Sequence, residues 1–124
     1  MYNISNFNFN KDSNIITIKK KFTILYLKVV LQKPTEYENH TYHKYVVRFK
    51  NKQIRDAVKE KIPGSGIHYP KPISEHPMYQ NITHRKGDYR NAKEICDTIL
   101  TLPMHPYLTD EEINSVTNTI MILA

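Results

Sequence analysis

The apolar residues of this 124-residue chain lie in short segments, and the longest of them, residues 22–31, spans ten positions and includes Lys28. A helix that crosses a membrane needs about 20 apolar residues, which makes each of these segments too short. Seven prolines divide the chain further. Short strands and helices separated by turns pack around one small core. The pattern therefore predicts one globular domain, or part of one, without a membrane anchor.

The charge balance of the chain is basic. Its 18 Lys and Arg residues exceed its 12 Asp and Glu residues and give a net charge of +6, which favours anionic partners such as phosphorylated ligands or nucleic acid. The single cysteine, Cys96, excludes an intramolecular disulfide and a zinc site built on paired thiols. Chains without disulfides belong by default to reducing compartments, so we expect a cytoplasmic location.

The N-terminal segment differs in composition from the rest. It is polar, rich in asparagine and without a helical or strand period. We therefore predict a poorly ordered leader over residues 1–21 and one domain over residues 22–124.

Three short strands are predicted within this domain. The β-branched and aromatic residues of 22–31 favour a strand. Residues 43–49 (HKYVVRF) alternate, which places Tyr45, Val47 and Phe49 on one face and Lys44, Val46 and Arg48 on the other. A third short strand is expected at 66–69, where Pro70 ends it.

Helices are predicted after Asn51, near Asn91 and after Thr109. Asn51 is a good N-cap, and Thr109 with Glu112 forms a capping box. Their apolar residues recur at helical spacing: Ile54, Ala57, Val58 and Ile62; Ala92, Ile95, Cys96 and Ile99; Ile113, Val116, Ile120 and Ala124. The predicted fold class is α+β, with about three short strands and helices packed on one face.

The six histidines do not form a metal-binding pattern. His40 and His43 are three residues apart, which in a strand places them on opposite faces. The others lie at irregular spacing, with no paired cysteines or HExxH motif: His68, His76, His84 and His105. We expect no metal site. We also expect no catalytic role for Cys96, because it lies on the apolar side of a predicted helix.

A basic cluster lies at the predicted junction of the second strand and the first helix. It comprises Lys44, Arg48, Lys50, Lys52 and Arg55. Basic clusters of this kind bind nucleic acid in some proteins, but no RNA- or DNA-binding motif accompanies this one. A solvated charged face is the simpler interpretation, and nucleic-acid binding stays open as an alternative.

The densest group of chemically specific residues is the segment IHYPKPISEHPMY, residues 67–79. His68 and Tyr69 precede two prolines, which form a rigid corner that can present an imidazole and a phenol outward. His68 can donate a hydrogen bond to a phosphate oxygen, and Tyr69 can donate or stack. A purely structural turn with a packed tyrosine is the competing interpretation.

Three motifs together resemble a known family. The runs YHKYVV (residues 42–47), GSGIHYPKPI (64–73) and ILTLPMHPYLTDEEI (99–113) follow one another in the order found in the C-terminal part of the DegT/DnrJ/StrS aminotransferases. These enzymes use pyridoxal phosphate (PLP) to aminate keto-sugars carried on nucleotides. The resemblance covers residues 39–124, fades over the preceding ten residues and is absent from the leader.

The resemblance implies a fold and a binding site. The fold is the small C-terminal domain of a fold-type I PLP aminotransferase, an antiparallel sheet flanked by helices. The implied substrate-binding residues are His68 and Tyr69, which contact the nucleotide-linked sugar or its diphosphate, and we add the nearby Lys71. By the same comparison His43 is structural. Lys61 departs from the family, which often has glycine before the isoleucine.

The resemblance also implies that residues 1–124 do not supply the groups that bind PLP. In the family, the lysine that binds PLP, the acid at the pyridinium nitrogen and the phosphate-binding residues belong to a large N-terminal domain. The first hypothesis is therefore a truncated nucleotide-sugar aminotransferase that has no catalytic residues, binds no PLP by itself and is inactive alone. The second is an interaction module that docks on a separately encoded aminotransferase half or on a homodimer partner. The third is the basic nucleic-acid binder.

Overall fold

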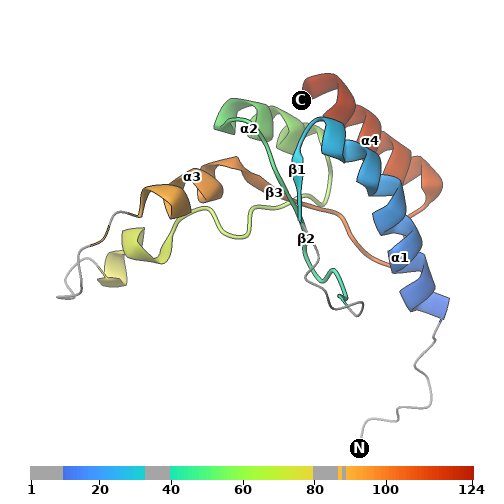
Figure 1. The fold of residues 1–124 in the computed structure, drawn as a ribbon, viewed down its shortest axis with the longest axis horizontal. Helices are drawn as coiled ribbons and strands as arrows, with labels where there is room; N and C mark the ends of the chain where they lie inside the picture. The colour runs from blue at the N-terminus through green and yellow to red at the C-terminus, as the bar shows by residue number, and fades with distance from the viewer. Residues whose placement is uncertain (1–9, 33–39, 80–86, 88) are drawn as a thin grey trace, which may run out of the picture.

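The computed structural model describes residues 10–32, 40–79, 87 and 89–124 (Figure 1). The elements follow one another in the order α1 (Asn10–Phe22), η2 (Thr23–Leu27), β1 (Val30–Leu31), β2 (Tyr45–Arg48), α2 (Lys52–Lys61), η3 (Ile73–Glu75), η4 (Pro77–Tyr79), α3 (Arg90–Thr98), β3 (Ile99–Leu102) and α4 (Asp110–Leu123). The elements labelled η are short 3-10 helices. Within these described ranges, no helix has the length and apolar character that spanning a membrane requires.

The strands form one antiparallel sheet in the order β1-β2-β3. Val47 of β2 lies opposite Leu31 of β1 and Leu100 of β3. Tyr45, Val47 and Phe49, which the alternation places on one face, are all buried. The second strand and the α+β fold class are therefore confirmed, and the sheet is antiparallel as the resemblance implies.

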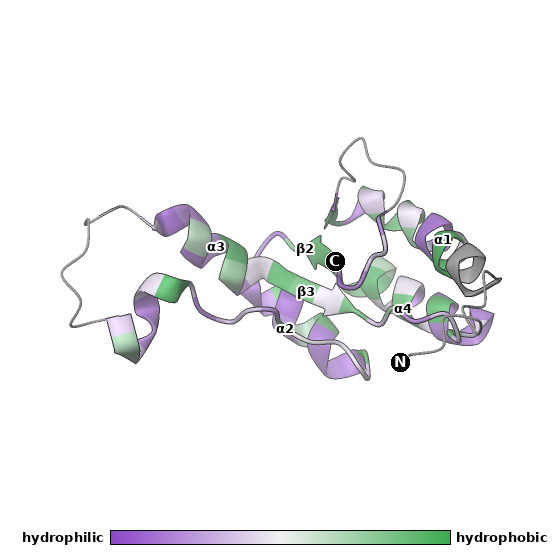
Figure 2. Cartoon of the chain, turned by 90° about the horizontal axis from the view of Figure 1, so that it is seen from below, coloured by the Kyte–Doolittle hydropathy of each residue, from purple (hydrophilic) through white to green (hydrophobic). Residues whose placement is uncertain are grey.

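One cluster of buried side chains joins the sheet to α1, η2, α2 and α4. Its fully buried members are Phe22, Leu25, Val47, Val58, Leu100, Leu102 and Ile120. Helix α4 contacts α1, η2 and α2, and α1 and α4 run side by side (Figures 1 and 2). An ion pair between Lys21 and Asp110 also joins these two helices. The helix α3, with η3 and η4, lies at the other end of the molecule.

The N-terminal prediction is wrong for the described residues. Residues 10–21, predicted to be a poorly ordered leader, belong to α1, and η2 lies where a strand is predicted, so that only Val30–Leu31 form β1. The cause is a helical period that crosses residue 21. Ile18, Phe22, Leu25 and Val29 recur at intervals of three or four and are buried. Polar residues and three consecutive lysines between them hide this period. Residues 1–9 lie outside the described part.

The predicted third strand at residues 66–69 is also wrong. Only Gly66 pairs there, through an isolated antiparallel bridge in which it exchanges both backbone hydrogen bonds with Thr101. The third strand of the sheet is β3, a segment that none of the three predicted strands includes. All four of its residues are buried. A strand buried on both faces has no alternation that would reveal it.

The three predicted helices are confirmed. The Asn51 side chain accepts a hydrogen bond from the Ile54 N–H at the start of α2, and Thr109 and Glu112 form the predicted capping box at the start of α4. The predicted apolar faces of α2 and α3 are only partly buried, because Ala57 in α2 and Ile95 in α3 are exposed.

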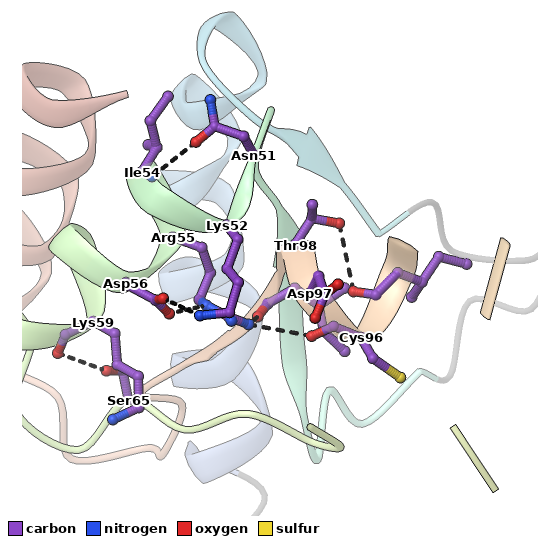
Figure 3. Close-up of polar contacts among 12 residues, drawn as sticks. Asn51, Lys52, Ile54, Arg55, Asp56, Lys59, Ser65, Cys96, Asp97 and Thr98 are labelled. Atoms are coloured by element: carbon purple, nitrogen blue, oxygen red, sulfur yellow. Dashed lines mark hydrogen bonds and ion pairs between the residues drawn. The ribbon is translucent and has the colours of Figure 1, made fainter. Parts of the chain in front are cut away.

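Arg55 is the buried residue of α2 that its apolar pattern does not predict. Its Nη1 donates hydrogen bonds to the carbonyl oxygens of Cys96 and Ile99 at 3.2 and 3.0 Å, and its Nε donates to Asp56 at 2.7 Å. Figure 3 shows the guanidinium between α2 and the end of α3. Together with Lys52, Arg55 holds the pKa of Asp56 below its usual value, the Lys52 hydrogen bond being the larger cause. Arg55 therefore connects α2 to the junction of α3 and β3.

The basic cluster noted in the sequence does not form one exposed cationic surface. Arg55 is buried, Arg48 forms an ion pair with Glu94, and Lys52 forms one with Asp56. Ion pairs neutralise charge that nucleic-acid phosphates would otherwise meet. This arrangement gives the nucleic-acid hypothesis no support.

Candidate substrate-binding site

His68 is held in a defined position beside the sheet. Its Nδ1 lies 2.9 Å from the Thr101 hydroxyl, and its Nε2 lies 3.5 Å from the Lys44 ammonium. Thr101 is itself buried in β3 and bridged to Gly66. The half-buried imidazole is thus fixed by the last strand of the sheet, although the chain places it 33 residues away from Thr101.

Gly66 leaves room for this imidazole. A Cβ atom at position 66 would lie 2.9 Å from the Cε1 of His68, which is closer than side-chain carbons approach. Any larger residue at position 66 would have to displace the ring. The glycine that precedes the HYP motif therefore positions His68, a role that the sequence alone does not reveal.

The other two predicted substrate-binding residues face solvent. Tyr69 is 70% exposed, and its ring contacts His68 edge-on with the ring centroids 5.8 Å apart. Lys71 is exposed as well. The structure thus brings His68 and Tyr69 together, while Lys71 stands two residues further along the same exposed corner.

A cavity of about 520 Å³ lies beside His68. It is bounded by the residues before β2, the end of α2, the segment after β3 and the first half of α4. Apolar side chains and basic side chains both line it. The apolar ones include Ile62, Leu102, Met104, Leu108 and Val116, and the basic ones are His43, Lys44, Lys61, His68 and His105.

Among these basic lining residues, sequence reasoning identifies only His68 as a candidate for substrate binding, and it names Lys44 only as part of the basic cluster. Tyr69 and Lys71 are not among the described residues that line the cavity. The signals for the others are weak, because a lone lysine or histidine in a loop is common. Lys61 has the clearest signal, because the family that the chain resembles often has a glycine at this position.

Glu112 is the one carboxylate among the described residues that line this cavity. Its Oε2 accepts a hydrogen bond of 2.8 Å from the Thr109 backbone N–H. This bond is the main reason why the pKa of Glu112 lies below its usual value, and the nearby His105 lowers it further. Glu112 is therefore ionised at neutral pH and engaged at the start of α4.

The described residues do not fit a complete PLP site. PLP chemistry needs a lysine that binds the cofactor and an acid that pairs with its pyridinium nitrogen. Lys44 and Lys61 line the cavity, but Glu112 is held in the capping box. In the ranges covered by the structure, no group of three His, Cys, Asp or Glu side chains could hold a metal ion either.

Residues 1–121 match the model of the DegT/DnrJ/EryC1/StrS aminotransferase family. The match includes residues 1–38, so the expectation that the resemblance is absent from the leader is wrong. The chain is 27% identical over 86 residues to the spore coat polysaccharide biosynthesis protein SpsC of Bacillus subtilis, an alignment that covers 62% of this chain and 22% of SpsC.

The fold is similar to that of solved aminotransferase structures. A DegT DnrJ EryC1 StrS aminotransferase from Brucella abortus superposes with a TM-score of 0.70 at 22% identity, over 90% of this chain and 30% of that one. NtdA from Bacillus subtilis, solved with bound cofactor PMP, superposes with a TM-score of 0.66 at 17% identity, over 93% and 28%. The alignments with curated relatives span only 18–25% of those relatives.

Proposed function

The chain belongs to the DegT/DnrJ/EryC1/StrS aminotransferase family, and we propose that it forms the substrate-facing part of a cytoplasmic enzyme that aminates a nucleotide-linked keto-sugar. The observation that carries this proposal is the fixed position of His68 between Thr101 and Lys44, with the exposed Tyr69 beside it. The contacts with Thr101 and Lys44 hold the imidazole in place, and the exposed phenol beside it can donate a hydrogen bond to a ligand in solvent.

In this proposal His68, Tyr69 and Lys71 bind the diphosphate or the sugar of the substrate. Phosphate oxygens accept hydrogen bonds from imidazole, phenol and ammonium groups alike, and the charge-assisted bonds among them are the strongest. PLP, when bound to a complete enzyme, supplies the electron sink for amino transfer. The residues described above do not complete its site, so we propose that these 124 residues are inactive without a PLP-binding domain.

Retention on a resin that carries a nucleotide-diphosphate hexose tests this assignment. We expect the double variant His68→Ala, Tyr69→Ala to bind about tenfold more weakly than the unmodified chain, because it loses the hydrogen bond from the Tyr69 phenol to a charged ligand and the contact with the His68 ring. The matched control replaces another exposed histidine and tyrosine, His76 and Tyr79, by alanine. Equal retention of the two double variants would rule the assignment out.

One observation favours docking onto a separately encoded aminotransferase half. Tyr26, Leu27 and Val30 are 66%, 57% and 65% exposed on neighbouring positions of η2 and β1, and all three border a groove with Phe49. We call these three residues the η2-β1 patch. Adjacent exposed apolar side chains of this kind mark surfaces that associate with another protein. The patch therefore suits a second polypeptide that supplies the PLP-binding domain.

Co-purification with the PLP-binding domain of a full-length relative tests this docking. We expect the unmodified chain to form a complex that the double variant Tyr26→Ser, Leu27→Ser loses, because it removes apolar area from the contact. Ile122→Ser, which changes a residue that is 80% exposed on α4, is the control. A chain that stays monomeric on gel filtration with and without the domain contradicts the docking proposal. Self-association of the chain alone contradicts it too, and indicates a homodimer.

A further inference from the structure

The cavity beside His68 collects positive charge from separate parts of the chain. Lys44 precedes β2, Lys61 ends α2, and His105 follows β3. His43 and His68 complete its basic lining. Four segments that are distant in sequence thus direct basic side chains to one hollow of the surface.

Within the described part of the chain, one ionised carboxylate of the lining, Glu112, offsets only part of this charge. Neither Lys44 nor Lys61 forms an ion pair with a carboxylate there. Glu112, the one acidic residue in the described lining, is bound to Thr109 at the start of α4. Charges of one sign that line a concave surface raise the local concentration of the opposite ion. The cavity therefore favours an anion.

The remaining wall of the cavity is apolar. Leu102 and Val116 are buried core residues that also line it, and Met104 and Leu108 add half-buried surface. Its volume of about 520 Å³ falls in the range typical of small-molecule sites, about 300–1,000 Å³. An inorganic anion would leave this apolar wall in contact with water. An organic ligand with an apolar body would cover it.

We propose that this cavity binds a small organic phosphate monoester, with its phosphate at Lys44 and Lys61 and its apolar body against Leu102 and Val116. A phosphate monoester offers about two negative charges and three acceptor oxygens, which suits two lysines with imidazoles beside them. A single carboxylate would leave more of these donors without an acceptor. The site goes beyond the proposed substrate contacts, because Lys61 and His105 have no role in them and Lys44 enters them only by holding His68.

Titration of the 124-residue chain with phenyl phosphate, followed by ¹H–¹⁵N NMR, tests the proposal. Phenyl phosphate carries the required charge and a ring, and it has no aldehyde that could react with a lysine. We expect saturable shifts at the amides of Thr101 and Leu102. Lys61→Ala should weaken binding about fivefold, and the Lys44→Ala, Lys61→Ala double variant should weaken it more than about tenfold.

The control is Lys59→Ala, which removes an exposed lysine of the same helix end that does not line the cavity. We expect it to leave the affinity unchanged, and we expect inorganic phosphate to bind about tenfold more weakly than phenyl phosphate. The absence of saturable shifts would overturn the proposal, and so would equal effects of Lys59→Ala and Lys61→Ala. Equal affinities for the two phosphates would overturn the assignment of the apolar wall.

The variant Tyr69→Ala separates this site from the proposed substrate contacts. Tyr69 does not line the cavity, so its replacement should leave phenyl phosphate binding unchanged while weakening retention on the nucleotide-sugar resin. Failure of the phenyl phosphate titration alone would remove the cavity site. Failure of the resin experiment alone would remove the proposed substrate contacts.

Discussion

Replacement of Phe22 by alanine is expected to lower the free energy of unfolding by about 3–5 kcal/mol, the range observed when buried aromatic side chains are truncated. Phe22 is fully buried at the end of α1, and its ring centroid lies 5.4 Å from that of Tyr45 in β2. The substitution removes apolar surface from the core and leaves a cavity between helix and sheet. Urea denaturation followed by circular dichroism measures the change.

Tyr26→Ala is the matched control, because it removes an aromatic ring four residues later that is 66% exposed. We expect it to change the free energy of unfolding by less than about 0.5 kcal/mol. The stability of a whole domain is only about 5–15 kcal/mol, so Phe22→Ala should leave a large unfolded fraction at moderate urea concentration. Equal effects of the two substitutions would show that α1 does not belong to the folding unit.

The elements that the sequence predicts correctly are those with local signals. Asn51 and the Thr109–Glu112 pair mark helix starts within a few residues of themselves, and the alternation of Tyr45, Val47 and Phe49 identifies β2. Helix α1 has no comparable local signal, because a few apolar residues among many polar ones determine its packing. Its stability comes from the sheet and α4, which no local pattern reveals.

The candidate site, too, can be predicted from the sequence only where its signals are local. The HYP corner is visible in the sequence, since His68 and Tyr69 adjoin two prolines. The position of His68 depends on Thr101 and Gly66, and the cavity beside it depends on Lys44, Lys61 and His105, which come from separate segments. Long-range strand pairing brings these residues together, and the local patterns of a single sequence do not predict that pairing.

Arg55 shows a further limit, because the sequence places it in a basic cluster whereas the structure buries it. Replacement of Arg55 by alanine is expected to lower the free energy of unfolding by about 3 kcal/mol, as when one partner of a buried polar network is removed. The change leaves the carbonyl oxygens of Cys96 and Ile99 without this donor and opens space between α2 and α3. Thermal and urea unfolding measure the loss.

Lys52→Ala separates the effect of burial from the effect of charge. Lys52 pairs with the same Asp56 carboxylate as Arg55 but is more than half exposed, so its removal should cost less than about 0.5 kcal/mol. Arg55→Lys keeps the positive charge, yet a single ammonium cannot reproduce the geometry of the guanidinium fork that reaches both carbonyls and Asp56. We expect Arg55→Lys to recover less than half of the stability lost in Arg55→Ala. Full recovery would mean that charge alone, and not the shape of the guanidinium, holds α2 against the start of β3.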